Sequence, residues 1–149
     1  MKNVQLCCGS NRIEGWENYD QDMDVTKPLR FGNSSVDTLL IEHGVEHFNT
    51  HEILRLFQEC HRVLKPGGKV RICVPSLGKI NDREHAKDLI LSHGHQMVFS
   101  PASLRYMLWA AGFERSKICQ TGRSPLDNHW RSIGIEKDEI ETIRCEAQK

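Results

Sequence analysis

The chain has 149 residues and carries twenty Lys and Arg residues against twenty Asp and Glu residues, so its formal net charge is zero. This length favours one domain that buries about 70% of the surface of its unfolded chain. Without an excess of positive charge, neither nucleic acid nor an anionic membrane is expected as a partner. Apolar runs fall short of the roughly 20 residues that cross a bilayer, and an apolar run follows Met1 almost at once. We therefore expect a cytoplasmic protein without a signal peptide.

Six cysteines form neither a disulfide framework nor a zinc pattern. Cys7 and Cys8 are adjacent, the other four stand alone, and no C-x-x-C pair occurs. Free cysteine behaves as a small hydrophobic residue and is often buried. We expect the cysteines to be reduced, and most of them to lie in strands.

Short apolar runs alternate with helical patterns, which is typical of an α/β sheet. Four runs are predicted strands: "NVQLCC" (3–8), "WENY" (16–19), "VDTLLI" (36–41) and "KVRICVP" (69–75). A helix is predicted between the last two strands, because Asn49 and Glu52 suit a capping box and apolar residues recur on one face through Leu64. The segment "KPGG" at 65–68 is predicted to end this helix and turn the chain. Strand, helix and strand in this order predict a right-handed βαβ unit with parallel strands.

A second helix is predicted over residues 101–111. Ser100 can cap it, Pro101 suits its first position, and Gly112 can end it. Its buried stripe is expected to include Leu104, Met107, Leu108, Trp109 and Ala111. After it, "RSKICQ" and "EIETIRCEA" predict an antiparallel pair at the sheet edge, and residues 76–97 form a candidate lid insertion within one domain spanning 1–149.

The turn after the first predicted strand suits a nucleoside ligand. It consists of Cys8, Gly9, Ser10 and Asn11, and glycine lets a ligand approach the backbone. Asp20, at the end of the second strand, would face the same crevice and can accept hydrogen bonds from both ribose hydroxyls, while Asp24 could accept from a base amine. The alternative is an ordinary turn and a solvated acidic loop. Neither a G-x-G-x-x-G fingerprint nor a P-loop occurs, which disfavours NAD and nucleoside triphosphates.

Four blocks in order, "VQLCCGSNRIEGWENYDQD", "DVTKPLRFGNSSVDTLLIEHGVEH", "ECHRVLKPGGKVRICVPSL" and "FSPASLRYMLWAAGF", resemble the class I S-adenosylmethionine-dependent methyltransferases, in particular the small type 11-like group. The resemblance covers about residues 4–113. It implies a seven-stranded, Rossmann-like, doubly wound, mostly parallel sheet with an antiparallel edge strand. It also implies S-adenosylmethionine as the cofactor and S-adenosylhomocysteine as the product.

The resemblance assigns cofactor-binding roles residue by residue. The loop Cys7, Cys8, Gly9, Ser10 and Asn11 matches the family's glycine-rich loop for the methionine part, and Asp20 matches the acid that binds the ribose. Asp24 and Val25 match the acid and the apolar residue that bracket the adenine. Glu42, His43 and Gly44 match the segment that lines the methyl-transfer pocket. Cys7 and Asn11 depart from the family's glycines, and too few positions separate Gly9 from Asp20 for the usual helix. The N-terminal helices that usually cover the cofactor are also missing, so weaker binding or a completing partner subunit is expected.

Methyl transfer needs an in-line approach and, for hydroxyl or amine acceptors, a base. His43, His47 and His95 are the candidate catalytic residues, because imidazole titrates near neutral pH. On a helix, His43 and His47 would share a face, which is also metal-ligand spacing. No third ligand is evident, so no metal is expected. Each histidine could equally be structural, and His51, His61, His85 and His129 are expected at the surface.

The predicted function is a S-adenosylmethionine-dependent methyltransferase that acts on a small-molecule or glycan-type acceptor. Nucleic-acid acceptors are disfavoured by the neutral charge, and "EHGV" stands where a [DN]-P-P-[YF] tetrapeptide would support base or glutamine methylation. The alternatives are a non-catalytic subunit that binds the cofactor or its product, and a degenerate fold that binds no nucleoside. A homodimer is expected.

Overall fold

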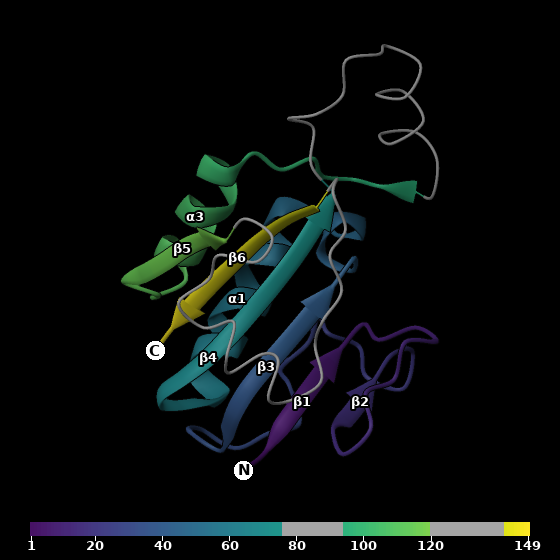
Figure 1. Cartoon of the computed structure of the whole chain (residues 1–149). Helices are drawn as coiled ribbons and strands as arrows, with labels where there is room; N and C mark the ends of the chain where they lie inside the picture. The colour runs from purple at the N-terminus through teal and green to yellow at the C-terminus, as the bar shows by residue number, and fades with distance from the viewer. Residues whose placement is uncertain (76–93, 120–141) are drawn as a thin grey trace.

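The computed structural model describes residues 1–75, 94–119 and 142–149, which form one α/β sheet with helices packed on it (Figure 1). The strands are β1 (Asn3–Leu6), β2 (Glu17–Tyr19), β3 (Val36–Glu42), β4 (Leu64–Pro75), β5 (Arg115–Cys119) and β6 (Thr142–Gln148). The helices are η1 (Val45–His47, a short 3-10 helix), α1 (Thr50–Val63) and α3 (Pro101–Ala110). Within these residues, no helix is both long enough and apolar enough to cross a bilayer.

The strands lie in the order β2-β1-β3-β4-β6-β5, as Figure 1 shows. The pairs β1–β2, β1–β3 and β3–β4 are parallel, whereas β6 is antiparallel to both of its neighbours, β4 and β5. The predicted mostly parallel sheet with an antiparallel pair at its edge is therefore confirmed. The resemblance implied seven strands, and the described residues supply these six.

Local sequence signals fix the starts of both long helices. The Asn49 side chain accepts from the backbone of Glu52, whose own carboxylate accepts from the Asn49 amide at 2.9 Å, so the predicted capping box is present. Ser100 caps α3 in the same way, with Pro101 in the first turn. Both helices begin where the sequence predicts.

Three predicted boundaries are wrong. The first strand stops at Leu6, because Cys7 takes a left-handed backbone with φ of 55°. The α1 helix ends at Val63, and Leu64 is already extended and pairs with Val36, so "KPGG" lies inside β4 and does not form a separate turn. The second strand omits Trp16. Residues 76–93, which make up most of the predicted lid, and residues 120–141 lie outside the described residues, as do His85 and His129 within them.

Alternate residues of the strands face α1 and α3, which contact each other on one side of the sheet. Val4, Leu39 and Val70 belong to this core and are fully buried. The opposite side carries polar residues that are also buried: Gln5, Thr38, Arg71, Arg144 and Glu146. Arg71 and Glu146 face each other across β4 and β6 and form an ion pair. The sheet therefore has one apolar buried face and one on which buried polar residues are mixed with Leu40 and Cys73.

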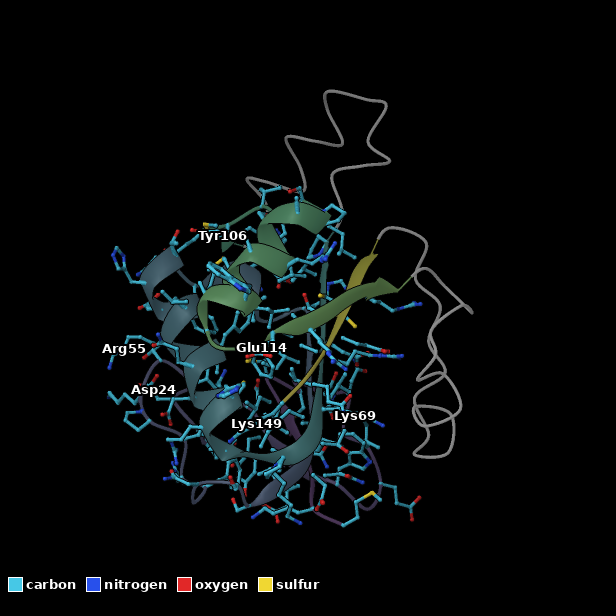
Figure 2. The ribbon with its side chains drawn as sticks, turned by 90° about the vertical axis from the view of Figure 1, so that its left-hand side faces the viewer. Asp24, Arg55, Lys69, Tyr106, Glu114 and Lys149 are labelled. Carbon is cyan, nitrogen blue, oxygen red and sulfur yellow. The ribbon has the colours of Figure 1, made fainter. Side chains whose placement is uncertain are left out.

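The expectation that Trp109 belongs to the core is wrong, whereas Met107 is buried as predicted. Trp109 is 62% exposed and stacks against Tyr106, whose exposed ring on α3 is labelled in Figure 2. His61, predicted at the surface, is half-buried against the Phe113 ring. Cys7, Cys8 and Cys60 are free thiols, as expected, and Cys73 and Cys145 are buried in strands β4 and β6.

Candidate functional site

The candidate site lies where β1, β2 and β3 end. The parallel register places Leu6 beside Tyr19 and beside Ile41, so the chain leaves all three strands at the same edge of the sheet. Cys7 and Asp20 follow directly, and His43 follows the last residue of β3. Ligands of parallel sheets bind at this carboxyl edge. The structure thus brings together the loop, the acid and the histidine that the sequence singled out.

Two backbone bonds join the loop after β1 to the end of β2. The Cys8 amide donates to the Tyr19 carbonyl at 3.1 Å, and the Gly9 amide donates to Asp20 Oδ1 at 3.3 Å. Gly9 has a φ of +50°, and a Cβ there would meet no atom within 4 Å. This left-handed backbone favours glycine, and the space above it is open to a ligand. Ser10 and Asn11 are exposed on the same turn, which the Asn11 amide closes onto Cys8.

Cys7 adopts the left-handed backbone that a glycine would take, and its side chain lies against η1. A Cβ built on Gly44 would lie only 2.5 Å from the Cys7 Cβ and 2.9 Å from its Sγ. Glycine at 44 therefore makes room for a cysteine at 7. Burial, with smaller effects from Asp20 and Glu46, raises the pKa of the Cys7 thiol to about 12. The thiol stays protonated at neutral pH and is a poor nucleophile.

Asp24 is an exposed acid whose carboxylate already has partners. Its Oδ1 accepts from the Thr26 hydroxyl at 2.6 Å, and its Oδ2 lies 3.0 Å from Lys27 Nζ. The Thr26 and Lys27 contacts lower the pKa of Asp24 to about 2. Val25, which follows it, is buried in the core. An adenine amine would have to share the Asp24 carboxylate with these two side chains.

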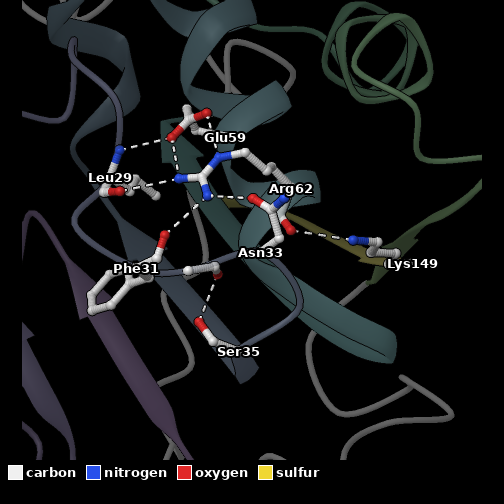
Figure 3. A network of polar contacts seen from close by, with 8 residues as sticks. Leu29, Phe31, Asn33, Ser35, Glu59, Arg62 and Lys149 are labelled. Atoms are coloured by element: carbon white, nitrogen blue, oxygen red, sulfur yellow. Dashed lines mark hydrogen bonds and ion pairs between the residues drawn. The ribbon is translucent and has the colours of Figure 1, made fainter.

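A polar network on α1 holds the loop that follows Asp24 (Figure 3). The Arg62 guanidinium donates to the carbonyls of Leu29 and Phe31 at 3.1 and 3.0 Å, and to the Asn33 side chain at 2.8 Å. It also pairs with Glu59, which accepts from the Leu29 amide at 2.8 Å. The Arg62 contact lowers the pKa of Glu59. One guanidinium thus anchors the segment that joins β2 to β3.

His43 does not share a helix face with His47. It has a φ of 49° and precedes η1, which begins only at Val45. Its amide donates to the Cys73 carbonyl at 3.0 Å, and its Nδ1 lies 3.6 Å from Glu46 Oε1. The two residues do not lie on one α-helix, because His43 belongs to a turn and His47 to a short 3-10 helix, so the shared face that an α-helix would give is absent. Glu42 and His43 do lie at the carboxyl end of β3, as the sequence predicted.

His47 instead pairs with His95. Their rings lie 4.9 Å apart between centroids, at an angle of 65°. The Glu46 carbonyl accepts from the amides of Gln96 and Met97 at 2.8 and 3.1 Å, which brings the segment before α3 against η1. Glu46, His47 and His95 could together hold a metal ion, since each offers one ligand atom and these atoms lie within 4.8 Å of one another. Sequence reasoning missed Glu46, because nothing local marks its carboxylate as buried.

Comparisons with known proteins give a family match over part of the chain and a shared fold over nearly all of it. Residues 8–72 match the family model described as "Methyltransferase domain". No curated protein matches the chain in sequence. The resemblance to methyltransferases of the type 11-like group is therefore supported over the segment that contains Asp20, Asp24, His43 and the loop residues from Cys8 to Asn11.

Solved structures of low identity share the fold. A SAM-dependent methyltransferase from Thermotoga maritima has a TM-score of 0.70 at 18% identity, covering 99% of this chain and 82% of that chain. One from Archaeoglobus fulgidus has a TM-score of 0.67 at 15% identity, covering 99% and 86%. A chain from the complex of the Haloferax volcanii Trm112 methyltransferase activator with its proposed methyltransferase has a TM-score of 0.64 at 13% identity, covering 99% and 81%. The Rossmann-like methyltransferase fold predicted from the sequence is confirmed.

Proposed function

With a methyltransferase-domain match and a methyltransferase fold as the premise, we propose that this protein binds S-adenosylmethionine at the carboxyl edge of β1, β2 and β3 and transfers its methyl group. The observation that carries the proposal is the joined loop and acid: an open glycine backbone at Gly9, hydrogen-bonded to Asp20 at the end of the neighbouring strand. The residues fit the group, because the glycine leaves space for the cofactor and the carboxylate can accept from ribose hydroxyls.

Each part of the site has a proposed binding role. The loop from Cys7 to Asn11 holds the methionine part, and Asp20 binds the ribose. Asp24 and Val25 flank the adenine, with Val25 fixed by the core beneath it. Glu42 and His43 face the methyl group from the end of β3. The Arg62 network supports this arrangement by holding the segment after Asp24 in one conformation.

The cofactor supplies an activated methyl group bonded to a sulfonium. The acceptor oxygen or nitrogen forms a bond to the methyl carbon while the carbon–sulfur bond breaks, and the acceptor releases a proton. The chain's contribution is to align the acceptor and to accept that proton. His43, His47 and His95 are the proposed catalytic residues for this step. We propose a small-molecule or glycan-type acceptor, in keeping with the neutral charge of the chain.

Transfer of a tritiated methyl group from S-adenosylmethionine to a panel of small hydroxyl and amine compounds and oligosaccharides tests the activity. With an accepted compound, His43→Ala should lower kcat by about 100-fold or more, as expected for loss of a general base. His51→Ala is the matched control, because His51 is also an exposed histidine but lies on α1. Cofactor binding without turnover on any acceptor would favour the alternative of a non-catalytic binding subunit.

Assembly and location are part of the proposal. The Haloferax chain belongs to a complex between a methyltransferase activator and a methyltransferase, and we propose that this chain also has a partner, a second copy or another subunit, which covers the cofactor. Light scattering at tens of micromolar is expected to give a dimer mass, and a monomer mass would exclude the homodimer. The cytoplasmic location stays a prediction, which cell fractionation can test.

A further inference from the structure

We infer that Glu46, His47 and His95 form a binding site for one divalent transition-metal ion of the zinc type. The ligand atoms of the three side chains lie within 4.8 Å of one another. Zinc bonds of 2.0 to 2.1 Å place tetrahedral ligands about 3.4 Å apart, so small side-chain rotations close the site. Two imidazoles and one carboxylate form a donor set that zinc uses in proteins.

The Glu46 carboxylate gives an independent reason for the site. Glu46 is 1% exposed, and its Oε2 is buried with no hydrogen-bond partner among the residues that the structure describes. Its other oxygen lies 3.6 Å from His43 Nδ1. A buried carboxylate oxygen without a partner is unfavourable, because it has lost its hydration. A cation beside Oε2 would compensate this loss, and the two imidazoles that would complete its shell are adjacent.

Backbone bonds hold the three ligands in place before any ion binds. The Glu46 carbonyl accepts from Gln96 and Met97, and the Gln96 side chain donates to the His47 carbonyl at 2.7 Å. His95 is therefore fixed beside His47, although the two residues are far apart in the sequence. Such support of the ligands lowers the conformational cost of binding a metal. The bound ion would tie the segment before α3 to η1.

Three protein ligands leave a fourth position for water or for an oxygen of a bound molecule. If the proposed methyltransferase activity holds, an ion bound there could orient the acceptor near His43, because His43 Nδ1 lies 3.6 Å from Glu46 Oε1, and His43 would be left to accept the proton. This last step rests on the proposed function. The metal site itself does not, and its test needs neither cofactor nor turnover.

The test is calorimetric titration of the full chain, freed of metal by a chelator, with Zn²⁺. We expect one ion per chain. Glu46→Gln and His95→Ala should each weaken the affinity for Zn²⁺ by at least about 100-fold, because losing a residue that only hydrogen-bonds to a metal ligand already weakens metal binding by about 10- to 100-fold. His51→Ala is the matched control and should leave the affinity unchanged, since His51 is exposed on α1. Circular dichroism establishes that each variant is folded.

Co²⁺ gives a second, spectroscopic readout. A four-coordinate site of nitrogen and oxygen ligands is expected to give visible absorption without a thiolate charge-transfer band. A thiolate band would assign the ion to a cysteine such as Cys7 and overturn the proposal. Absence of one-to-one binding, or equal affinity in the folded Glu46→Gln and His95→Ala variants, would overturn it as well. The same samples are titrated with S-adenosylhomocysteine. If this compound binds while Zn²⁺ does not, the metal site fails and the proposed cofactor site stands.

Discussion

Gly44→Ala tests the close contact between η1 and the loop after β1. The new Cβ would lie 2.5 Å from the Cys7 Cβ, whereas carbon atoms in contact prefer about 3.5 to 4.0 Å. Both atoms are attached directly to backbone, so a rotamer change cannot separate them, and the backbone must move by about 1 Å. Overpacking of this kind costs about 1–3 kcal/mol. The φ of Gly44 is −132°, so alanine would not have to adopt the left-handed backbone there.

Removing the Cys7 side chain should abolish this cost. Cys7→Gly loses the packing of a small side chain but relieves a left-handed backbone that costs a non-glycine residue about 1–2 kcal/mol, so its net effect should be small. Gly44→Ala in the Cys7→Gly background should then cost under about 0.5 kcal/mol. Urea unfolding of the four proteins, followed by circular dichroism, gives the coupling energy. An equal cost of Gly44→Ala in both backgrounds would refute the reasoning.

Three further predictions concern stability. Glu146→Ala should lower the free energy of unfolding in urea by about 3–5 kcal/mol, because Arg71 loses the carboxylate of its buried ion pair. Adding Arg71→Met should recover most of this stability, and a loss below about 1 kcal/mol in Glu146→Ala would contradict the prediction. Arg62→Lys should lower the free energy of unfolding by about 1–3 kcal/mol and speed hydrogen exchange at the Leu29 amide, because lysine cannot bind all the acceptors of the guanidinium. Unchanged exchange at Leu29 would contradict the role of Arg62 in holding this segment. Burial lowers the pKa of His61 below 6.5 in the folded protein. The imidazole of the unfolded chain therefore binds a proton more readily, so the free energy of unfolding decreases as the pH falls below about 6.5. His61→Gln should flatten the dependence of unfolding free energy on pH between about 7 and 5, and an unchanged slope would contradict it.

Signals confined to a few neighbouring residues were read correctly from the sequence. The Asn49 and Ser100 caps depend on residues three positions away, so each start could be predicted without knowing the fold. The positions of Gly9 and Asp20 at one sheet edge followed from parallel strand order alone. These features fix the fold class and the outline of the candidate site.

Features that depend on distant contacts were missed. Leu64 looks like a continuation of α1, and only its pairing with Val36 makes it extended. Trp109 follows Leu108 by 100° around the helix, which turns it away from the sheet towards Tyr106. Glu46 became a candidate ligand only when the Gln96 backbone brought His95 beside His47. Tertiary contacts decide all three cases, and sequence periodicity does not contain them.

The proposed cofactor site is tested most directly by calorimetric titration with S-adenosylmethionine and S-adenosylhomocysteine. Asp20→Ala should weaken both affinities by about 10- to 100-fold, because hydrogen bonds to a charged acceptor contribute about 1.5–3 kcal/mol. Glu14→Ala removes one negative charge from an exposed position between β1 and β2 and should have a much smaller effect. Binding that Asp20→Ala loses and Glu14→Ala keeps is the expected result. Failure of both ligands to bind, or equal binding to wild type and Asp20→Ala, would contradict it.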